Sequence, residues 1–251
     1  MCFDEPSASD IPALKLLWKQ AFGDPDETID GFFNLAFDRR RCRIARLGGR
    51  TAAALYWFDC EWCGEPLAYI YAVATDAVFR GQGICHALMS DVLARLGRLG
   101  YAGAILVPGD AGLFGFYAGM GYQTSCHIGE FDCEASSDSP VMRRLGADEY
   151  AFLRRKFLPE GGVIQERENL AFLSLDAQFW AGDGVILAAR REDDRLIGVE
   201  LLGRPELAPG IVNALGCRVG HFRVPGSTHP FAMFRPLRPV PPPVYFGLPL
   251  D

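Results

Sequence analysis

The sequence has little of what marks nucleic-acid-binding, membrane-spanning or exported proteins. Lysine and arginine number 25 against 31 acidic residues, so the net charge of −6 leaves no excess of cations to neutralise a phosphate backbone. No apolar run approaches the roughly 20 residues needed to span a bilayer. The opening MCFDEPSASD is acidic where a signal peptide would be basic and then apolar. We therefore expect a cytoplasmic protein that binds neither nucleic acid nor membrane.

Paired cysteines and clustered histidines are also scarce. The eight cysteines are scattered, mostly inside apolar segments, which favours reduced and buried thiols over a disulfide framework. Cys60 and Cys63 form a lone CxxC, and a structural zinc site needs four ligands, so we interpret this pair as the end of a hairpin. Four dispersed histidines show no metal-ligand spacing: His86, His127, His221 and His229. The sequence predicts no metal site.

What the chain does have is enough apolar sequence for one large core or two modest ones, since 49% of its 251 residues are hydrophobic. The small polar stretch EASSDSP, residues 134–140, separates two segments that each restart with a helix-like pattern. We predict two domains, residues 1–135 and 141–251.

The first segment alternates helical and strand-like patterns. The caps and apolar spacing predict helices over 10–23, 24–37, 84–97 and 110–122, and strands over 41–49, 50–62, 65–79, 101–109 and 122–133. The order α, α, β, β, β, α, β, α, β indicates an α/β fold in which helices flank a sheet.

The stretch VFRGQGICHALMSDVLARLG, residues 78–97, places a cation and two glycines at the start of an amphipathic helix. A helix N-terminus presents unpaired N–H groups and a partial positive charge, and glycines let an anion approach the backbone closely. Arg80, Gly81, Gln82 and Gly83 therefore suit a pyrophosphate. Taken alone, the same residues would also serve as a plain connection between a strand and a helix.

Two motifs carry a family resemblance. VATDAVFRGQGIC resembles the acetyl-CoA-binding signature Q/R-x-x-G-x-G/A of the GNAT superfamily of N-acetyltransferases, with Arg80, Gly83 and Cys85 on its defined positions. Cys85 departs from the usual glycine or alanine. FGFYAGMGYQ resembles the second signature of the family, and the resemblance covers about residues 5–133. It implies a mixed, mainly antiparallel sheet flanked by helices.

The resemblance also implies a mechanism in which acetyl-CoA is the co-substrate. Val73 and Thr75 fall where the central strand splays and pantetheine pairs with backbone, and the amide of Val73 would polarise the acetyl carbonyl. Tyr117 matches the tyrosine that protonates the leaving thiolate; its alternative is a core tyrosine on an amphipathic helix. We interpret Asp110 mainly as a helix cap.

The general base stays open. Glu61, Glu65, Asp76 and Glu130 are candidates on the predicted central strands and their ends, and none is favoured over a solvated carboxylate. Asp76 lies one turn before Arg80, where an ion pair between the two is expected.

The second segment partly echoes the first. Its pattern predicts helices over 147–158 and 205–216, and strands over 184–192, 195–203, 217–224, 230–237 and 244–250. It has Pro205 and Pro209 where the first segment has its arginine–glycine loop. It looks like a degenerate second GNAT-like unit, as in the enhanced intracellular survival type of acetyltransferase. In that group the terminal carboxylate can enter the active site, which makes Asp251 a further hypothesis for the base.

Two classes of function remain. The first is an acetyl-CoA-dependent N-acetyltransferase acting on the primary amine of a small molecule or, less in keeping with the sequence, of a protein. The second is a non-catalytic acyl-CoA-binding or scaffold protein. The acidic net charge weakly favours a cationic acceptor. The sequence does not identify the acceptor or the oligomeric state.

Overall fold

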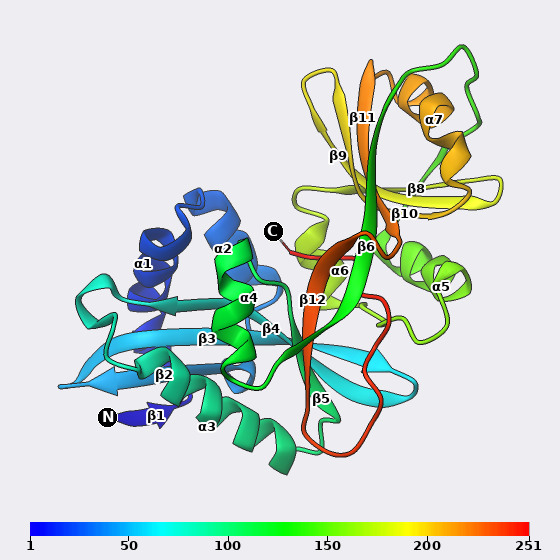
Figure 1. The fold of residues 1–251 in the computed structure, drawn as a ribbon. Coiled ribbons are helices and arrows are strands. Elements are labelled where there is room, and N and C mark those ends of the chain that lie inside the picture. The colour runs from blue at the N-terminus through cyan, green and yellow to red at the C-terminus, as the bar shows by residue number, and fades with distance from the viewer. Residues whose placement is uncertain (251) are drawn as a thin grey trace.

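The computed structural model describes residues 1–250 and contains one continuous sheet of twelve strands (Figure 1). Its strand order is β1-β2-β3-β4-β5-β12-β6-β11-β10-β9-β8-β7. Two pairs are parallel, β4–β5 and β10–β11, and the others are antiparallel. The predicted class, a mixed and mainly antiparallel sheet flanked by helices, is confirmed. Asp251 lies outside the described residues, and with it the hypothesis about the terminal carboxylate.

Residues 1–135, called the first half below, form the predicted elements in the predicted order, preceded by one strand, β1, that was not predicted. They are β1 (Cys2–Asp4), α1 (Ile11–Phe22), α2 (Asp26–Leu35), β2 (Cys42–Leu47), β3 (Arg50–Trp62), β4 (Glu65–Thr75), α3 (Ile84–Arg98), β5 (Gly103–Leu106), α4 (Ala111–Ala118) and β6 (Gln123–Glu134). Cys63 lies in the turn between β3 and β4, so the CxxC marks the end of a hairpin as predicted.

Residues 141–250, the second half, add nine elements. They are β7 (Arg143–Leu145), α5 (Ala147–Phe157), α6 (Glu168–Leu173), β8 (Gln178–Gly182), β9 (Val185–Glu192), β10 (Arg195–Gly203), α7 (Ala208–Ala214), β11 (Val219–Pro225) and β12 (His229–Pro236). The strand predicted over 244–250 is wrong. This apolar run is buried but irregular, with a single bridge between Tyr245 and Gly162, because side chains rather than a neighbouring strand satisfy much of its backbone.

The two halves repeat one order of elements and exchange their last strands. β1 to β5 and β7 to β11 each follow the order β, α, α, β, β, β, α, β. β6, from the first half, pairs with β11, whereas β12, from the second half, pairs with β5. β6 and β12 also pair with each other at the centre of the sheet, so each half completes the sheet of the other.

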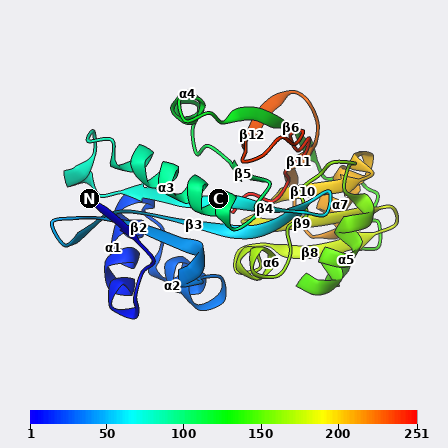
Figure 2. The same cartoon turned by 90° about the horizontal axis from the view of Figure 1, so that it is seen from below.

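The helices cover both faces of the first half of the sheet, and β3 shows why. Strand side chains alternate between faces with a period of two. On one face of β3, the side chains of Ala54, Tyr56 and Phe58 pack with α1 and α2. On the other face, those of Ala53, Leu55 and Trp57 pack with α3. Figure 2 shows α1 and α2 on one face of the sheet and α3 on the other. Both faces of β3 and β4 are therefore buried, which fixes the position of the loop that follows β4.

Candidate active site

The loop before α3 has the backbone geometry of an anion site. Gly81 and Gly83 both have φ of 74°, a left-handed conformation that residues with a side chain rarely adopt. A Cβ at either position would meet nothing within 4 Å, so the space beside the loop is open. Among residues 1–250 no side chain caps the first turn of α3, which leaves its N–H groups available to a ligand. The residues fit a diphosphate.

Arg80 places a positive charge at this helix end. Its side chain is exposed, its Nε donates a hydrogen bond to the carbonyl of Thr75 (3.1 Å), and it forms no ion pair with any residue between 1 and 250. The expected pair with Asp76 is wrong. Asp76 instead caps the short turn after β4 by accepting from the amide of Val78 (2.9 Å), and its charge lies 3.8 Å from Arg50. The guanidinium of Arg80 therefore stays available for an anionic ligand.

Cys85 and Gln82 have different surroundings within this loop region. Gln82 is exposed, and its Nε2 lies 3.4 Å from the carbonyl of Val78. Cys85 is half-buried in the first turn of α3, where burial raises the pKa of its thiol to about 11 while a hydrogen bond with Thr75 opposes that shift. Cys85 is therefore a neutral thiol near pH 7 and adds no negative charge to the site.

β4 separates from its parallel neighbour beside this loop. The two strands pair over only three residues, Leu67–Tyr69 with Gly103–Ile105. Beyond them β4 bulges away from the regular ladder, because Ala72 and Val73 together oppose a single residue of β3 and Ala72 has φ of 46°. The edge of β4 that faces β5 beyond Tyr69 thus has no strand partner within the described part of the chain, and an extended amide-bearing ligand can pair with it.

Tyr117 lies on α4 with its hydroxyl unengaged. The helix begins at a cap, since Asp110 accepts hydrogen bonds from the amides of Gly112 (2.7 Å) and Leu113 (3.2 Å), which confirms its predicted capping role. The side chain of Tyr117 is 8% exposed, and its hydroxyl has no hydrogen-bond partner among residues 1–250. Burial raises the pKa of Tyr117 above its usual value, with smaller contributions from Cys85 and Asp110.

Beside these features lies a cleft of about 1010 Å³ whose walls come from both halves. Val73 and Tyr117 line it, and both pack in the same apolar cluster as Cys85. Thr75 and residues 80–85 do not line it; they lie at the end of β4 and the start of α3. The structure therefore divides the predicted site residues into two groups, one in the cleft and one at the neighbouring helix N-terminus.

The cleft also carries charged side chains that the sequence did not single out. Asp24 accepts a hydrogen bond from the indole of Trp18 (2.6 Å), and Asp176 lies 3.4 Å from Arg190. These residues come from segments about 150 positions apart, so no local pattern could have joined them.

Among the four candidate bases, one lines the cleft. Glu130 does so, and Arg223 donates a hydrogen bond to it (3.2 Å). The other three lie outside the cleft in ion pairs: Glu61 with Arg155, Glu65 with Arg238, and Asp76 with Arg50.

The corresponding helix of the second half has a blocked N-terminus. α7 follows Pro205 and carries Pro209, which has no N–H to offer. The linker between the halves covers this end: the amide of Ser136 donates to the carbonyl of Pro209 (3.1 Å), and a Cβ on Gly210 would lie 2.8 Å from Pro140. The second unit is therefore degenerate at the position of the first unit's anion site.

Two further findings describe what residues 1–250 lack. None of their helices is long and apolar enough to cross a membrane. Within the same range, no three His, Cys, Asp or Glu side chains gather in a group that could hold a metal ion.

An open strand edge next to a glycine-rich helix N-terminus, within a mixed sheet flanked by helices, is the arrangement of the GNAT fold. Residues 3–125 match the family model of the acetyltransferase (GNAT) domain, so this part of the chain is a GNAT domain. Membership of this domain family supports an acyl-transfer activity, in which the acyl donor is an acyl-CoA. No curated protein matches the sequence.

Solved structures support the fold and its tandem arrangement. The chain is similar to a probable N-acyltransferase from Enterococcus faecalis, with 17% identity, a TM-score of 0.73 and coverage of 94% of this chain and 72% of that one. It is also similar to Eis1 from Mycobacterium abscessus, with 12% identity, a TM-score of 0.71 and coverage of 94% of this chain and 74% of that one. A tandem GNAT protein from the clavulanic acid biosynthesis pathway is similar as well, with 12% identity, a TM-score of 0.59 and coverage of 96% of this chain and 99% of that one.

Proposed function

We propose that the protein is an acetyl-CoA-dependent N-acetyltransferase that moves the acetyl group to the primary amine of a small molecule. The observation that carries the proposal is that β4 links two features: its open edge at Val73 lies in the cleft with Tyr117, and its end leads into the free N-terminus of α3. In this proposal residues 1–135 and 141–251 are two GNAT-like units, of which only the first binds the cofactor.

The diphosphate of acetyl-CoA would lie against the amides of the Gly81–Gly83 loop, with the guanidinium of Arg80 beside it. Backbone N–H groups at a helix N-terminus stabilise anions without a large desolvation cost. Gln82 and Cys85 would contribute their amides to the same site. Pantetheine would then extend along β4, pairing with the backbone near Val73 and Thr75 and directing the thioester into the cleft.

The amine would attack the thioester directly, with no acyl-enzyme intermediate. The N–H of Val73 would donate to the acetyl oxygen as negative charge develops there. The raised pKa of Tyr117 keeps its hydroxyl protonated at neutral pH, so it can hand its proton to the departing thiolate. Glu130 is the candidate base that lines the acceptor end of the cleft.

A small acceptor is favoured over a protein because both halves contribute walls to the cleft. Pro249 and Leu250 add to these walls from the end of the chain. The carboxylate of Asp24, which also lines the cleft and forms no ion pair with any residue between 1 and 250, suits a cationic amine.

The test is thiol release from acetyl-CoA over a panel of small amines and peptides, alongside calorimetric binding of CoA. We expect turnover with at least one small amine and a large loss of turnover in Tyr117→Phe. Tight CoA binding with no turnover above background and no effect of Tyr117→Phe would instead support a scaffold function. Turnover with peptides alone would support a protein N-acetyltransferase.

A further inference from the structure

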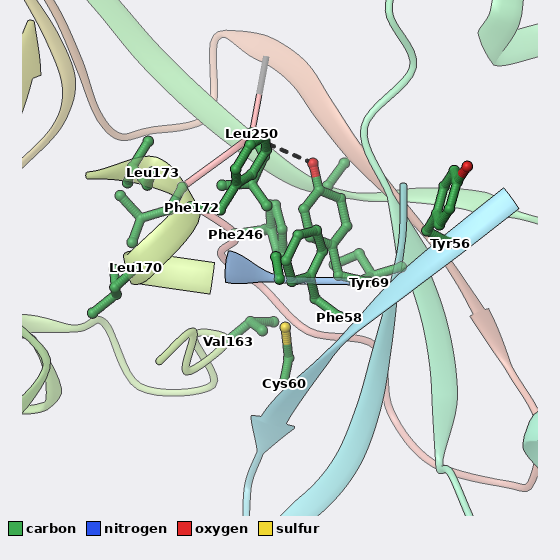
Figure 3. Packing of buried hydrophobic residues seen from close by; sticks show 14 of the residues in the cluster. Tyr56, Phe58, Cys60, Tyr69, Val163, Leu170, Phe172, Leu173, Phe246 and Leu250 are labelled. Atoms are coloured by element: carbon green, nitrogen blue, oxygen red, sulfur yellow. Dashed lines mark hydrogen bonds between the residues drawn. The ribbon is translucent and has the colours of Figure 1, made fainter. Parts of the chain in front are cut away.

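The last described residues form an irregular strap, residues 244–250, that runs through the core and ends at the cleft. All of these residues except Val244 are buried. Figure 3 shows Phe246 and Leu250 packed among aromatic side chains of the core, with Leu250 hydrogen-bonded to Tyr69. Pro249 and Leu250 line the cleft. The strap therefore forms part of the cleft wall without having a regular strand to hold its register.

Side chains hold the strap at its cleft end. The amide of Gln165, which is fully buried, donates to the carbonyl of Leu248 (2.6 Å) and accepts from the N–H of the same residue (3.2 Å). Tyr71 donates its hydroxyl to the carbonyl of Leu250 (2.6 Å), and the N–H of Leu250 donates to Tyr69 (3.3 Å). The side chain of Gln165 thus bonds both the N–H and the carbonyl of Leu248, as a residue of a neighbouring strand would do.

A buried carboxylate holds the strap at its other end. Glu200 on β10 is fully buried and accepts hydrogen bonds from Arg154 (2.6 and 2.8 Å), Tyr150 (2.9 Å) and Tyr245 (3.0 Å). Arg154 also donates to the carbonyl of Val163 (3.1 Å). Burying a charged pair is costly unless its hydrogen-bonding groups are satisfied, and here the strap supplies one of the donors. The Glu200 cluster therefore fixes where Tyr245 lies.

The loop at 161–165 connects these two anchors to the first half. The amide of Val163 donates to the carbonyl of Tyr245 (2.8 Å). Ile164 and Glu61 on β3 exchange two backbone hydrogen bonds (2.8 and 3.0 Å). Contacts therefore run without a break from β10, through the loop and the strap, to the strands that hold the predicted acyl site.

We propose that Gln165 and the Tyr245–Glu200 hydrogen bond are positioning groups for acceptor binding: they fix the register of the strap, so that Pro249 and Leu250 form the wall of the acceptor end. This inference rests on the proposed function, since an acceptor end exists only if the cleft carries acyl transfer. Under it, the second half contributes to the reaction through the strap as well as through the residues it places in the cleft.

The decisive variant is Gln165→Leu, which removes both hydrogen bonds to Leu248 and leaves the Arg154–Glu200 pair intact. We expect the KM for the acceptor amine to rise by about 10-fold or more, with the KM for acetyl-CoA and the affinity for CoA unchanged, because only acceptor binding uses the strap wall. Hydrogen exchange should accelerate in residues 244–250 and not across the second half. Tyr245→Phe, which removes one hydrogen bond, should give a smaller change of the same sign.

Val212→Ala is the matched control, because Val212 is a fully buried side chain of α7 in a core cluster that contains no strap residue. It should lower stability and leave the acceptor KM unchanged. An unchanged acceptor KM in Gln165→Leu despite faster exchange of the strap would overturn the inference. So would exchange that rises throughout the second half in Gln165→Leu.

The two proposals fail in different ways. Absence of turnover by the wild-type protein with every amine would overturn the proposed function. The exchange data would then decide the anchoring separately: acceleration confined to 244–250 in Gln165→Leu supports it, and unchanged exchange of that segment contradicts it.

Discussion

The two halves of the molecule contain the same crossover, and only one of them has the geometry of a cofactor site. β4–α3–β5 and β10–α7–β11 both join parallel strands through a helix. Both entering strands also leave their partners early: β4 pairs with β5 over three residues, and β10 pairs with β11 over four. Each of them bulges just beyond that pairing, at Ala72 and Val73 in β4 and at Val199 in β10.

The difference lies at the start of the helix. α3 follows two left-handed glycines and Arg80, which forms no ion pair with the described residues, whereas α7 carries a proline in its first turn and lies under the linker between the halves. Strand divergence and a bulge are shared by both halves and therefore do not set the proposed diphosphate site apart. Free N–H groups at the helix N-terminus, which favour anion binding, are present in the first half and blocked in the second.

The largest effect on stability is expected in the second half, which contains the buried ion pair of Arg154 and Glu200. Glu200→Ala leaves the charge of Arg154 buried without a partner and should lower the free energy of unfolding by about 3–5 kcal/mol. Urea denaturation measures it. Replacing both residues, Arg154→Met with Glu200→Leu, should recover much of that loss because no unpaired charge remains. A single variant as stable as the wild type would contradict this account of the pair.

The next effect tests the chemistry assigned to the first half. Tyr117→Phe removes the proposed proton donor and should lower kcat by about 100-fold or more, with CoA affinity retained. Tyr122→Phe is a matched control, because the hydroxyl of Tyr122 is buried next to Tyr117 without a partner in residues 1–250. If both variants lower kcat equally, Tyr117 has no special role.

The pH profile gives a related prediction for Tyr117. Its pKa is raised by burial, so the protonated and active form persists to higher pH than for an exposed tyrosine. Activity should rise with pH as the acceptor amine loses its proton, with no fall due to Tyr117 below its ordinary pKa of about 10. Initial rates in the wild type measure this profile. An alkaline fall near pH 8 that Tyr117→Phe abolishes would contradict the assignment.

A smaller effect compares the two helix entries directly. Arg80→Ala should weaken CoA binding by about 10- to 100-fold, the range expected for one hydrogen bond to a charged group. Arg204 occupies the matching place before α7 and pairs with Glu206 (2.9 Å). Arg204→Ala should therefore leave CoA affinity unchanged in calorimetry. Equal losses in both variants would remove the distinction between the halves.

The smallest effect concerns backbone conformation within α3. Gly83→Ala should destabilise the protein by about 1 kcal/mol, because a side chain in the left-handed region is strained. Gly97→Ala should have the opposite sign, since Gly97 lies in the last turn of the helix with open space around it and alanine is the better helix former. Thermal unfolding of both variants measures the difference; a stabilising Gly83→Ala would show that the loop does not need this conformation.

Features of the site that depend on neighbouring residues were predictable from the sequence. The Asp110 cap, the glycine loop and the apolar face of α3 each lie within a few positions of one another, so local physics determines them. The degenerate start of α7 was predictable for the same reason, because Pro209 removes a backbone donor whatever the tertiary structure.

Features that depend on distant partners were not predictable. Arg154 lies in the charged run FLRRKF, which is typical of a solvated helix, and its partner Glu200 follows 46 positions later. The insertion of β12 between β5 and β6 has no local signal, because an alternating pattern shows which face of a strand is buried and not which strand lies beside it. The apolar strap was predicted as a strand because a buried strand and a buried irregular segment have the same apolar sequence pattern. The backbone of the strap is instead satisfied in part by the side chain of Gln165, a distant residue that the pattern does not reveal.

Titration of the wild-type protein with CoA by calorimetry tests the central claim most directly. The account predicts one CoA per chain, bound at the start of α3, with no detectable heat in Arg80→Glu and wild-type binding in Arg204→Glu. Two sites per chain, no binding at all, or unchanged binding in Arg80→Glu would contradict it.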